Sequence, residues 1–329
     1  MLVFVSEFLC SGACSNVPLD DSLASEGKAM LLAILEDFAR IPDCQIVTTL
    51  DPRLEGLSEQ GSDWASRVIV HPCESQQSEQ QMFQRLAREA DATFVIAPEF
   101  DDCLASRRRL VDEANGRFLG SSLSAIQLCA DKLALAHKLE EIQVATIPTL
   151  ALDDHRVPWE STEVVVKPRC GAGSQATFQL QATDPLSAEI KSSGWQFIRQ
   201  PYIAGTPLSV AVMSDGDKHT IFPVADQQIS TDRRFHYLGS DLPSTSKIND
   251  STIRAIVESI AAEIPGLDGF WGIDLLLTQD KQLLVVEINP RLTSSYLVYR
   301  QSARFNVAEL ILGTSVVIEW DAEPVRFRV

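Results

Sequence analysis

The chain has 329 residues, 45% of them hydrophobic, and a formal net charge of −17. This length allows two or three domains with substantial cores. So acidic a protein lacks the surplus of basic side chains that displaces counterions from nucleic acid or docks on anionic lipid. No segment is long and apolar enough to span a membrane. We therefore expect neither nucleic acid nor a membrane among its partners.

Seven cysteines are spread along the chain, and no two of them form a C-x-x-C pair. An odd number of scattered cysteines is typical of reduced thiols rather than of a disulfide framework. This pattern predicts a cytoplasmic protein.

Residues 1–120 alternate short apolar runs with amphipathic stretches, a pattern typical of a doubly wound α/β domain. The predicted strands are Leu2–Val5, Gln45–Thr49, Val68–Pro72, Thr93–Pro98 and Arg117–Gly120. Apolar residues at helical spacing predict helices over residues 31–38 and 82–90. This alternation implies a parallel sheet covered by helices on both faces. Ligands bind beyond the carboxyl ends of such strands, although each of these segments is equally well a connecting loop: 6–16, 71–77 and 99–102.

Residues 121–203 form a smaller unit. Asp131 is suited to cap a helix over Lys132–Glu141, which follows a shorter helix over residues 123–128. Next comes a predicted strand, Val164–Lys167, that runs into a glycine loop. The remaining predicted elements are a strand over Ala176–Gln181, a helical piece around residues 185–191 and a strand over Trp195–Gln200. Together they make a small β-loop-β-α-β unit.

The glycine loop, GAGSQA at residues 171–176, satisfies the dinucleotide-binding pattern G-x-G-x-x-A. That motif must open a helix whose N-terminus faces a pyrophosphate, but residues 176–180 alternate like a strand. A glycine loop between two antiparallel strands would instead lay backbone N–H groups over phosphates as a lid, with Lys167 supplying a cation. A glycine hairpin without a ligand and a nicotinamide-dependent Rossmann enzyme are the alternatives.

Residues 204–329 mix strands and helices. The predicted strands are Leu208–Met213 and Thr220–Val224, and a long polar loop over residues 225–250 follows them. Apolar residues between positions 253 and 264 form one clean helix face. A helix from about Ser295 and a weak strand near Val316–Glu319 are expected to end the chain.

The stretch DGFWGIDLLLTQDKQLLVVEINPRLTSS, residues 268–295, is the most informative. Its two apolar runs predict a hairpin, and they are Phe270–Thr278 and Gln282–Ile288. Asp274 lies in the first run, and Glu287 and Asn289 project together from the second because strand residues two apart share a face. Unpaired charges are costly in apolar strands, so these oxygens predict a Mg²⁺ site rather than an ordinary hairpin with a polar face. Arg291 follows directly and is suited to bind a phosphate or acyl phosphate.

In this order, these pieces resemble the ATP-grasp superfamily, whose members join a carboxylate to an amine with ATP. The residues that match the family's nucleotide and magnesium positions are Lys132, Lys167, Asp274, Glu287 and Asn289. The resemblance covers nearly the whole chain. It implies a Rossmann-like pre-ATP-grasp domain over residues 1–120, a lid subdomain over 121–203, and a C-terminal subdomain with the metal site over 204–329.

The resemblance also implies the positions of the cofactors, ATP and Mg²⁺ (or Mn²⁺). ATP would lie between the lid and the C-terminal subdomain, with Lys132 and Lys167 on its phosphates. The glycine loop would cover the phosphates through Gly171, Gly173 and Ser174, and the hinge that reads adenine would be Gln200, Pro201, Tyr202 and Ile203. Many relatives hold ribose with a Glu after the hinge; here Ser209 is the substitute.

Within the superfamily, several segments resemble the tyramine–glutamate ligases of methanofuran biosynthesis. They are Glu7 with the glycine-containing segment after it, G-x-P-x-S-V at 205–210, Tyr237-Leu-Gly, and E-I-N-P-R-L-T-S-S-Y at 287–296. The resemblance implies an amide ligase that joins glutamate to tyramine or a similar amine through an acyl phosphate, with Arg291 and Lys167 in catalysis. Another amino acid and amine pair, or a kinase-like protein that binds ATP without ligating, are the alternatives. A homodimer is compatible with the sequence.

Four further side chains are candidates for substrate binding: Arg233, Arg234, Tyr237 and Tyr296. Arg233 and Arg234 are suited to glutamate carboxylates, or are a solvated basic pair. Tyr296 would line a pocket for an aromatic amine, or would pack its helix against the hairpin. The proton acceptor for the amine is not identifiable, because His236, the one candidate, is equally well a solvated loop residue.

Overall fold

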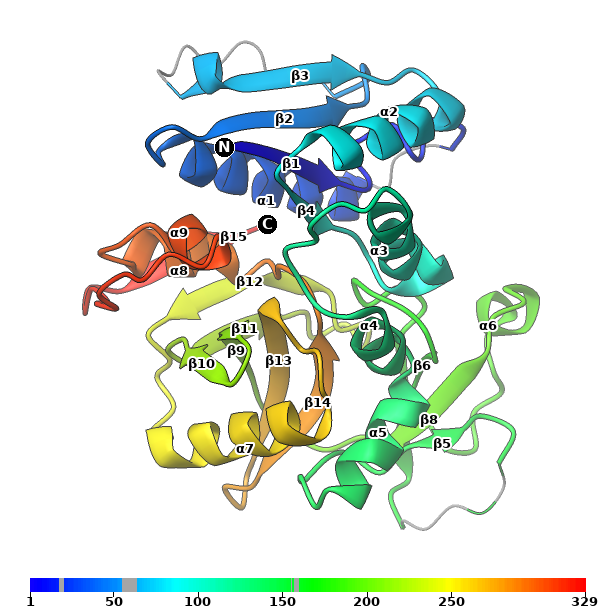
Figure 1. Cartoon of the computed structure of the whole chain (residues 1–329). Helices are drawn as coiled ribbons and strands as arrows, with labels where there is room; N and C mark the ends of the chain where they lie inside the picture. The colour runs from blue at the N-terminus through cyan, green and yellow to red at the C-terminus, as the bar shows by residue number, and fades with distance from the viewer. Residues whose placement is uncertain (18–20, 55–63, 155, 157–159) are drawn as a thin grey trace.

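The computed structural model describes residues 1–17, 21–54, 64–154, 156 and 160–329. Within these residues the strands form three sheets (Figure 1). A parallel sheet of N-terminal strands lies at the top of the view, a larger C-terminal sheet lies below it, and a small antiparallel sheet stands beside the larger one. Among the described residues, no helix has the length and apolar character required to cross a bilayer.

The N-terminal sheet has the order β3-β2-β1-β4, and all its neighbouring strands are parallel. Its strands are β1 (Leu2–Glu7), β2 (Gln45–Leu50), β3 (Val68–Pro72) and β4 (Ala92–Ile96). Helix α1 (Asp21–Ala39) packs on one face, and α2 (Gln76–Glu89) and α3 (Cys103–Glu113) pack on the other. A 3₁₀ turn precedes β3 (Ala65–Arg67) and another precedes α3 (Phe100–Asp102). The predicted parallel sheet with helices on both faces is confirmed.

Two details of this domain differ from the prediction. Residues 117–120 form no strand; Phe118 makes a single isolated bridge to Thr93 before the chain turns toward the next helix. Helix α3 was not predicted because its buried face is not purely apolar. That face includes Arg107, whose guanidinium pairs with Glu79 at 2.7 Å and stacks over aromatic rings.

The small sheet, the lid, has the order β5-β8-β6-β7 and is antiparallel. Its strands are β5 (Leu150–Ala151), β6 (Glu163–Pro168), β7 (Phe178–Gln181) and β8 (Phe197–Pro201), with helix α6 (Ala188–Ser192). Helices α4 (Leu123–Ala130) and α5 (Lys132–Glu141) lead into it. Asp131 caps α5 as predicted, accepting bonds from the backbone N–H groups of Leu133 and Ala134 at 3.1 Å. The glycine loop joins two antiparallel strands and opens no helix, which argues against the Rossmann alternative.

The C-terminal sheet has the order β14-β13-β9-β11-β12-β15, with β10 paired to β9. Its strands are β9 (Gly205–Asp215), β10 (Lys218–Ile221), β11 (Ala225–Ile229), β12 (Tyr237–Leu242), β13 (Gly269–Thr278), β14 (Leu283–Asn289) and β15 (Val325–Arg328). Helix α7 (Asp250–Glu263) covers one face together with α4 and α5. Helices α8 (Tyr296–Ser302) and α9 (Val307–Ile311) lie between the other face and α1.

Two expectations for this region are wrong. The segment 225–250 is not one polar loop, because it contains β11 and β12. Their sequences predicted a loop because their polar side chains, such as Gln227, face a cavity rather than a core. The final strand is β15, not residues 316–319, where Val317 is 82% exposed. In β15, Val325 and Phe327 pack against the core that α1 and α8 share, while Arg326 and Arg328 are exposed.

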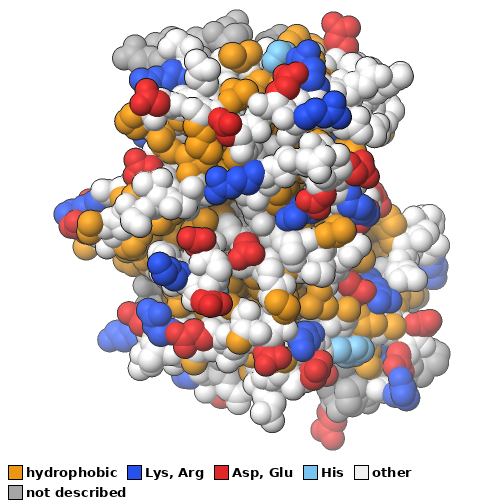
Figure 2. Space-filling view, in the orientation of Figure 1, with side chains coloured by type: hydrophobic (Ala, Val, Ile, Leu, Met, Phe, Trp, Pro, Cys, Tyr) orange, Lys and Arg blue, Asp and Glu red, His pale blue; other side chains and the backbone are white. Residues whose placement is uncertain are grey.

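The largest core cluster joins the N-terminal domain to the C-terminal sheet through α1, α8 and α9. It includes a buried network in which the hydroxyl of Tyr296 donates to Asp37 at 2.5 Å while Arg300 pairs with the same carboxylate at 2.7 Å. The first and last thirds of the chain are therefore packed together, and α1 contacts the segment that follows β14. On the face in Figure 2, acidic and basic side chains are interspersed rather than gathered into one basic patch.

Candidate active site

The β13–β14 hairpin brings its acidic residues together. Asp274 and Glu287 are direct cross-strand partners, and Asn289 is opposite Gly272 two positions along. Trp271, Ile273 and Leu275 point into the core under α7, so Asp274 lies on the opposite face. A β-bulge follows Asp274, since the register shifts there by one residue of β14. Backbone pairing therefore fixes the predicted convergence of the three side chains.

Two amides and two ammonium groups surround this pair of carboxylates. The amides of Asn289 and Gln227 donate to Asp274 at 3.1 and 2.8 Å, and the Nζ of Lys132 lies 3.1 Å from Glu287. Burial and the charge of Glu287 raise the pKa of Asp274. Burial lowers the pKa of Lys167 to about 8. The negative charge of Glu287 opposes this shift, and the positive charge of Lys132 adds to it. The site thus concentrates charges of both signs in a small space.

The donor set fits a hard divalent cation. Two carboxylates and one amide oxygen are ligands that Mg²⁺ prefers, and Mg²⁺ is commonly held by one or two carboxylates together with substrate phosphates. Among the described residues, no cluster of three His, Cys, Asp or Glu side chains is arranged to hold a metal. Asp274, Glu287 and Asn289 would therefore depend on a ligand such as a phosphate to complete the shell. Burial and the neighbouring charge of Glu287 both disfavour the charged form of Asp274 and raise its pKa, and a bound cation would oppose both effects.

The glycine loop is held over the hairpin from three sides. The Nζ of Lys132 donates to the carbonyl of Gly171 at 2.7 Å, and the hydroxyl of Ser174 donates to the carbonyl of Phe235 at 2.6 Å. Gly173 has a φ of +62°, and a Cβ there would overlap the side chain of Leu23 on α1. Because this position needs both the left-handed backbone and the missing side chain, only glycine allows the loop to reach the N-terminal domain.

A cavity of about 220 Å³ lies between the lid and the C-terminal sheet. One end is ionic and is lined by Lys132, Lys167, Asp274 and Glu287. The other end is apolar, with side chains from β6, β13 and β14. The predicted hinge, residues 200–203, forms part of its wall. This shape, apolar at one end and charged at the other, suits a base joined to phosphates.

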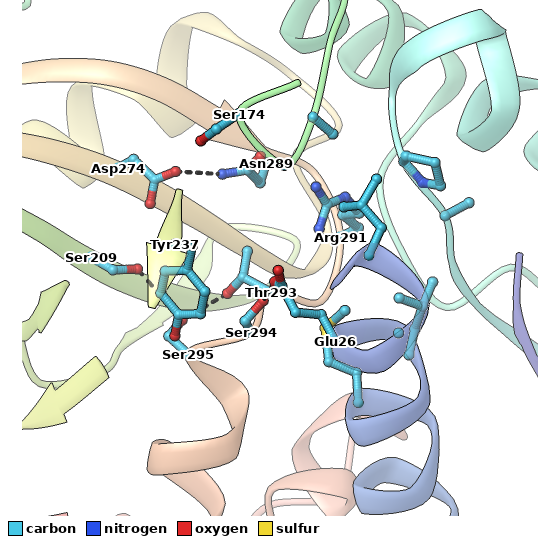
Figure 3. A pocket seen from close by; sticks show the side chains of 18 of the residues that line it. Glu26, Ser174, Ser209, Tyr237, Asp274, Asn289, Arg291, Thr293, Ser294 and Ser295 are labelled. Carbon is cyan, nitrogen blue, oxygen red and sulfur yellow. Dashed lines mark hydrogen bonds between the residues drawn. The ribbon is translucent and has the colours of Figure 1, made fainter. Parts of the chain in front are cut away.

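A second cavity of about 180 Å³ adjoins the first and lies between the N-terminal domain and the C-terminal sheet (Figure 3). The two cavities share seven lining residues: Ala172, Gly173, Ser174, Gln227, Ile229, Asp274 and Glu287. One wall of the second cavity is a row of polar groups that includes Tyr237, Thr293, Ser294 and Ser295. The paired carboxylates and the tip of the glycine loop thus border both spaces.

Arg291 projects into this second cavity from the turn after Asn289 (Figure 3). Its guanidinium donates to both carboxylate oxygens of Glu99, at 2.8 and 3.0 Å, and to the carbonyl of Leu292 at 3.0 Å. Although burial alone would lower it, the charge of Glu99 raises the pKa of Arg291. The guanidinium is therefore charged and held in one orientation.

The chain was compared with known proteins. The ATP-grasp domain family matches residues 129–295, which is half of the chain, and the pre ATP-grasp 3 domain family matches residues 44–126. The chain belongs to the ATP-grasp family. The predicted ATP-grasp fold and the assignment to its ligase class are both confirmed.

Individual relatives of this ATP-grasp chain are distant but match along most of their length. A tyramine–L-glutamate ligase from Methanocaldococcus fervens is 22% identical over 89% of this chain and 88% of the relative. An ATP-grasp superfamily protein from Archaeoglobus fulgidus, 23% identical in sequence, superposes with a TM-score of 0.74. The superposition covers 100% of this chain and 92% of the Archaeoglobus chain. A third relative is the biotin carboxylase domain of Hydrogenobacter thermophilus 2-oxoglutarate carboxylase, solved with MgADP and bicarbonate. It is 15% identical and superposes with a TM-score of 0.71 over 96% of this chain and 70% of its own chain.

Several predicted site residues of the ATP-grasp chain lie away from the spaces proposed for them. Ser209 lines the second cavity instead of the first, with its hydroxyl 3.4 Å from that of Ser295, so it does not face the cavity in which the ribose was expected. Tyr296 is fully buried on Asp37 and packs its helix, which was the alternative. Only Tyr237 of the four substrate candidates lines the second cavity.

The basic pair of the polar segment also lies elsewhere. Arg233 is 3.8 Å from Glu163, and Arg234 stacks on Phe178 in the lid, so both lie where the C-terminal sheet meets the lid and line neither cavity. His236 is half exposed beside Asp232 and lines neither cavity. These placements remove the basic pair and the histidine from the proposed chemistry.

Sequence analysis missed Gln227, Glu26 and Glu99, and it attached no chemical role to Glu7. The carboxyl ends of parallel strands are the positions where ligands bind in doubly wound sheets. Glu7 and Leu9 lie at the end of β1, and Pro98 and Glu99 lie just after β4. That position was the available signal. Gln227 and Glu26 had none, because a polar residue within a polar strand or on a helix surface resembles any solvated side chain.

Proposed function

We propose that the protein is an ATP- and Mg²⁺-dependent carboxylate–amine ligase that joins glutamate to tyramine or a similar primary amine. The observation that carries this proposal is the pair of adjoining cavities that share the carboxylates of Asp274 and Glu287 and the glycine loop. A phosphoryl donor in one space and an acceptor in the other would meet at that shared wall. The distant tyramine–glutamate ligases and the MgADP-bound structural neighbour support the choice of substrates and cofactor.

In the first step, the γ-phosphoryl group of ATP passes to a glutamate carboxylate and gives an acyl phosphate. Lys132 and Lys167 would neutralise the phosphates, and the loop from Gly171 to Ser174 would exclude water that hydrolyses the product. A Mg²⁺ or Mn²⁺ ion bound by Asp274, Glu287 and Asn289 would supply charge neutralisation on the triphosphate. Catalysis then depends on positioning and electrostatics, and requires no nucleophilic side chain.

In the second step, an uncharged amine attacks the acyl carbon and phosphate leaves. Arg291 would stabilise the negative charge that develops on the carbonyl oxygen and on the departing phosphate. Its salt bridge to Glu99 fixes the guanidinium in the second cavity before either substrate arrives. Preorganisation of this kind means that little reorganisation is needed during the reaction.

The proposal also covers the residues that contact adenine and substrate, the pathway and the cellular location. Gln200, Pro201, Tyr202 and Ile203 would contact the adenine, and Tyr237 would contact a substrate. A role in a methanofuran-type pathway and a cytoplasmic location belong to the same proposal. The seven cysteines are free, which supports a reducing compartment.

The decisive experiment measures phosphate release and product mass with ATP, Mg²⁺, glutamate and a panel of amines. Release that requires both glutamate and an amine, together with an amide of the expected mass, supports the ligase. Phosphate or phosphorylated product formed with a single substrate supports the kinase-like alternative. Nucleotide binding without any turnover across the panel contradicts both enzymatic proposals.

A further inference from the structure

The second cavity has two chemically different walls. The C-terminal wall is hydroxyl-rich and carries Arg291, Ser294 and Ser295. The N-terminal wall is apolar, with side chains from the loop after β1, from α1 and from the end of β4: Leu9, Leu23, Met30, Ile96, Ala97 and Pro98. Glutamate, with two carboxylates, matches the polar wall. The apolar wall is suited to a molecule with a hydrocarbon body.

One buried acid stands within that apolar wall. Glu7, the last residue of β1, is 2% exposed and lines the cavity. One oxygen of its carboxylate accepts the backbone N–H of Cys10 at 2.7 Å. A Cβ at position 27 would lie 2.7 Å from the other oxygen, so Gly27 on α1 leaves room for the carboxylate. The fold therefore makes space for an acid here, although an aliphatic side chain would suit the surrounding residues better.

A buried carboxylate that faces a cavity requires a positive partner. The charge of Arg291 acts on Glu7, but both carboxylate oxygens of Glu99 already accept from this guanidinium. Glu26 also lines this cavity, and the hydroxyl of Ser294 donates to it at 2.8 Å. The residues that line this cavity include four acids, Glu7, Glu26, Asp274 and Glu287, and one guanidinium that is already paired. Lys132 and Lys167 act on the pair at the shared wall and do not line this cavity. Its charge attracts a cation.

We propose, on the basis of the function proposed above, that Glu7 binds the ammonium group of the amine substrate and accepts its proton. The substrate class is a primary amine with an apolar body, which would lie along the N-terminal wall with its nitrogen directed at Glu7. The amine would arrive after the acyl phosphate has formed on the polar wall, beside Arg291.

The proton balance of this step is complete. The ammonium transfers one proton to the Glu7 carboxylate, and the nitrogen lone pair then forms the C–N bond to the acyl carbon. The bond from that carbon to the phosphate oxygen breaks, and its electron pair leaves with phosphate. The second nitrogen proton goes to the departing phosphate, and Glu7 later releases its proton to solvent. No oxidant or additional reactant is required.

The surroundings of Glu7 suit a proton acceptor. Burial raises its pKa to about 7, against the lowering effects of the Cys10 N–H and of Arg291. General bases work best when their pKa lies near the operating pH. The charged and titratable groups that interact with Glu7 include Arg291, which is paired with Glu99, and the thiols of Cys10 and Cys14 in the segment after β1. Glu26 on α1 lines the same cavity.

The test separates the two halves of the reaction in the full-length protein. Hydroxylamine, which is largely uncharged at neutral pH, traps an acyl phosphate as a hydroxamate without needing an ammonium site or a base. In Glu7→Gln we expect kcat/KM for tyramine to fall by about 10²-fold or more. Hydroxamate formation from glutamate and ATP should stay within about threefold, because the acyl phosphate still forms.

Two further measurements exclude a structural explanation. Glu74→Gln removes the same charge from an exposed position that lines neither cavity, and it should leave both reactions unchanged. The thermal midpoint of Glu7→Gln at mildly alkaline pH should be equal to or higher than that of the natural protein, since a buried charge is removed. Calorimetric titration with tyramine should show weaker binding in Glu7→Gln than in Glu74→Gln.

The outcomes are distinguishable. If the natural protein forms neither hydroxamate nor amide from any carboxylate, the proposed function fails and this inference fails with it. If hydroxamate forms but Glu7→Gln loses it in parallel with the tyramine reaction, Glu7 serves glutamate or the fold and this inference alone is overturned. An unchanged tyramine reaction in Glu7→Gln overturns it as well.

Discussion

The two adjoining cavities are assembled in different ways. The cavity in which we propose that the nucleotide binds, called the nucleotide cavity below, is formed by the lid and the C-terminal sheet, and its acidic residues are register partners of one hairpin. The second cavity depends on contacts between distant parts of the chain: Arg291 with Glu99, 192 residues away, and Ser294 with Glu26, 268 residues away. The first cavity is thus encoded by local pattern, and the second by the docking of the N-terminal domain.

This difference has a functional consequence. A nucleotide site that is complete within two neighbouring sheets can stay the same while the N-terminal wall changes, and that wall faces the second substrate. If the proposed function holds, docking along α1, α8 and α9 would set which amine is accepted, whereas the hairpin would set which phosphoryl chemistry is performed. The following experiments test whether the two cavities are separable in this way.

The largest effect is expected from Asp274→Asn at the shared wall. Loss of one carboxylate from the predicted metal site should lower kcat by about 10³-fold or more, because charge neutralisation at the triphosphate is worth several kcal/mol. Burial raises the pKa of Asp274, so its charge destabilises the fold at high pH, and the thermal midpoint of the variant should be unchanged or higher. Phosphate release and thermal unfolding check both. Retention of full activity would remove the hairpin from the chemistry.

A smaller effect is expected from Lys167→Ala, which affects the nucleotide cavity alone. Removal of a charged contact to phosphate costs about 1.5–3 kcal/mol, so ATP affinity should fall about 10- to 100-fold. Tyramine binding, measured by calorimetry without nucleotide, should not change, because Lys167 does not line the second cavity. Equal losses for both ligands would show that the cavities are not separable. A nicotinamide enzyme, by contrast, would keep its cofactor in this variant.

The hairpin could be predicted because its physics is local. A carboxylate in an apolar strand is costly, and the two-residue strand period placed Glu287 and Asn289 on one face without any knowledge of the fold. The helix cap at Asp131 and the strand before the glycine loop were predictable for the same reason. The family resemblance then supplied the order of the pieces.

The rest could not be predicted because its cause is tertiary. The sequence of strand β11 predicted a loop because it lacks the alternation of apolar residues that is typical of a strand. Gln227 and Gln228 donate to Asp274 and Asp241 instead of packing in a core. The expected role of Tyr296 depended on its orientation, which is decided by the buried carboxylate of Asp37 on another domain. Ser209 is in the predicted position along the chain but faces the opposite cavity. In each case the deciding partner is distant in sequence.

The pH dependence of stability tests the electrostatics of the second cavity. Burial raises the pKa of Glu7 from 4.5 to about 7, so the folded state retains a proton that the unfolded chain releases. This stabilisation is complete below about pH 4.5 and is lost as the pH rises to about 7. Between about pH 5 and pH 8 the natural protein should therefore lose about 2–3 kcal/mol more than Glu7→Gln does.

Urea unfolding of both proteins at the two pH values gives this difference, and other titrating groups cancel in the comparison. The slope of the free energy of unfolding against urea should be the same for both proteins. Parallel pH profiles would mean that the Glu7 carboxylate is solvated and that burial does not control its charge.

The smallest effect is expected at Gly173, where the glycine loop of the lid approaches Leu23 on α1. In Gly173→Ala the left-handed backbone costs about 1–2 kcal/mol, and the added methyl group overlaps Leu23, so the loop should close less well over both cavities. We expect KM for glutamate and for the amine to rise about 10-fold. Gly216→Ala is the matched control, since Gly216 has a φ of +57° and nothing within 4 Å of its added carbon. It should lose similar stability with unchanged KM values. If both variants raise KM alike, general backbone strain explains the effect, and the contact between the lid and α1 does not control closure.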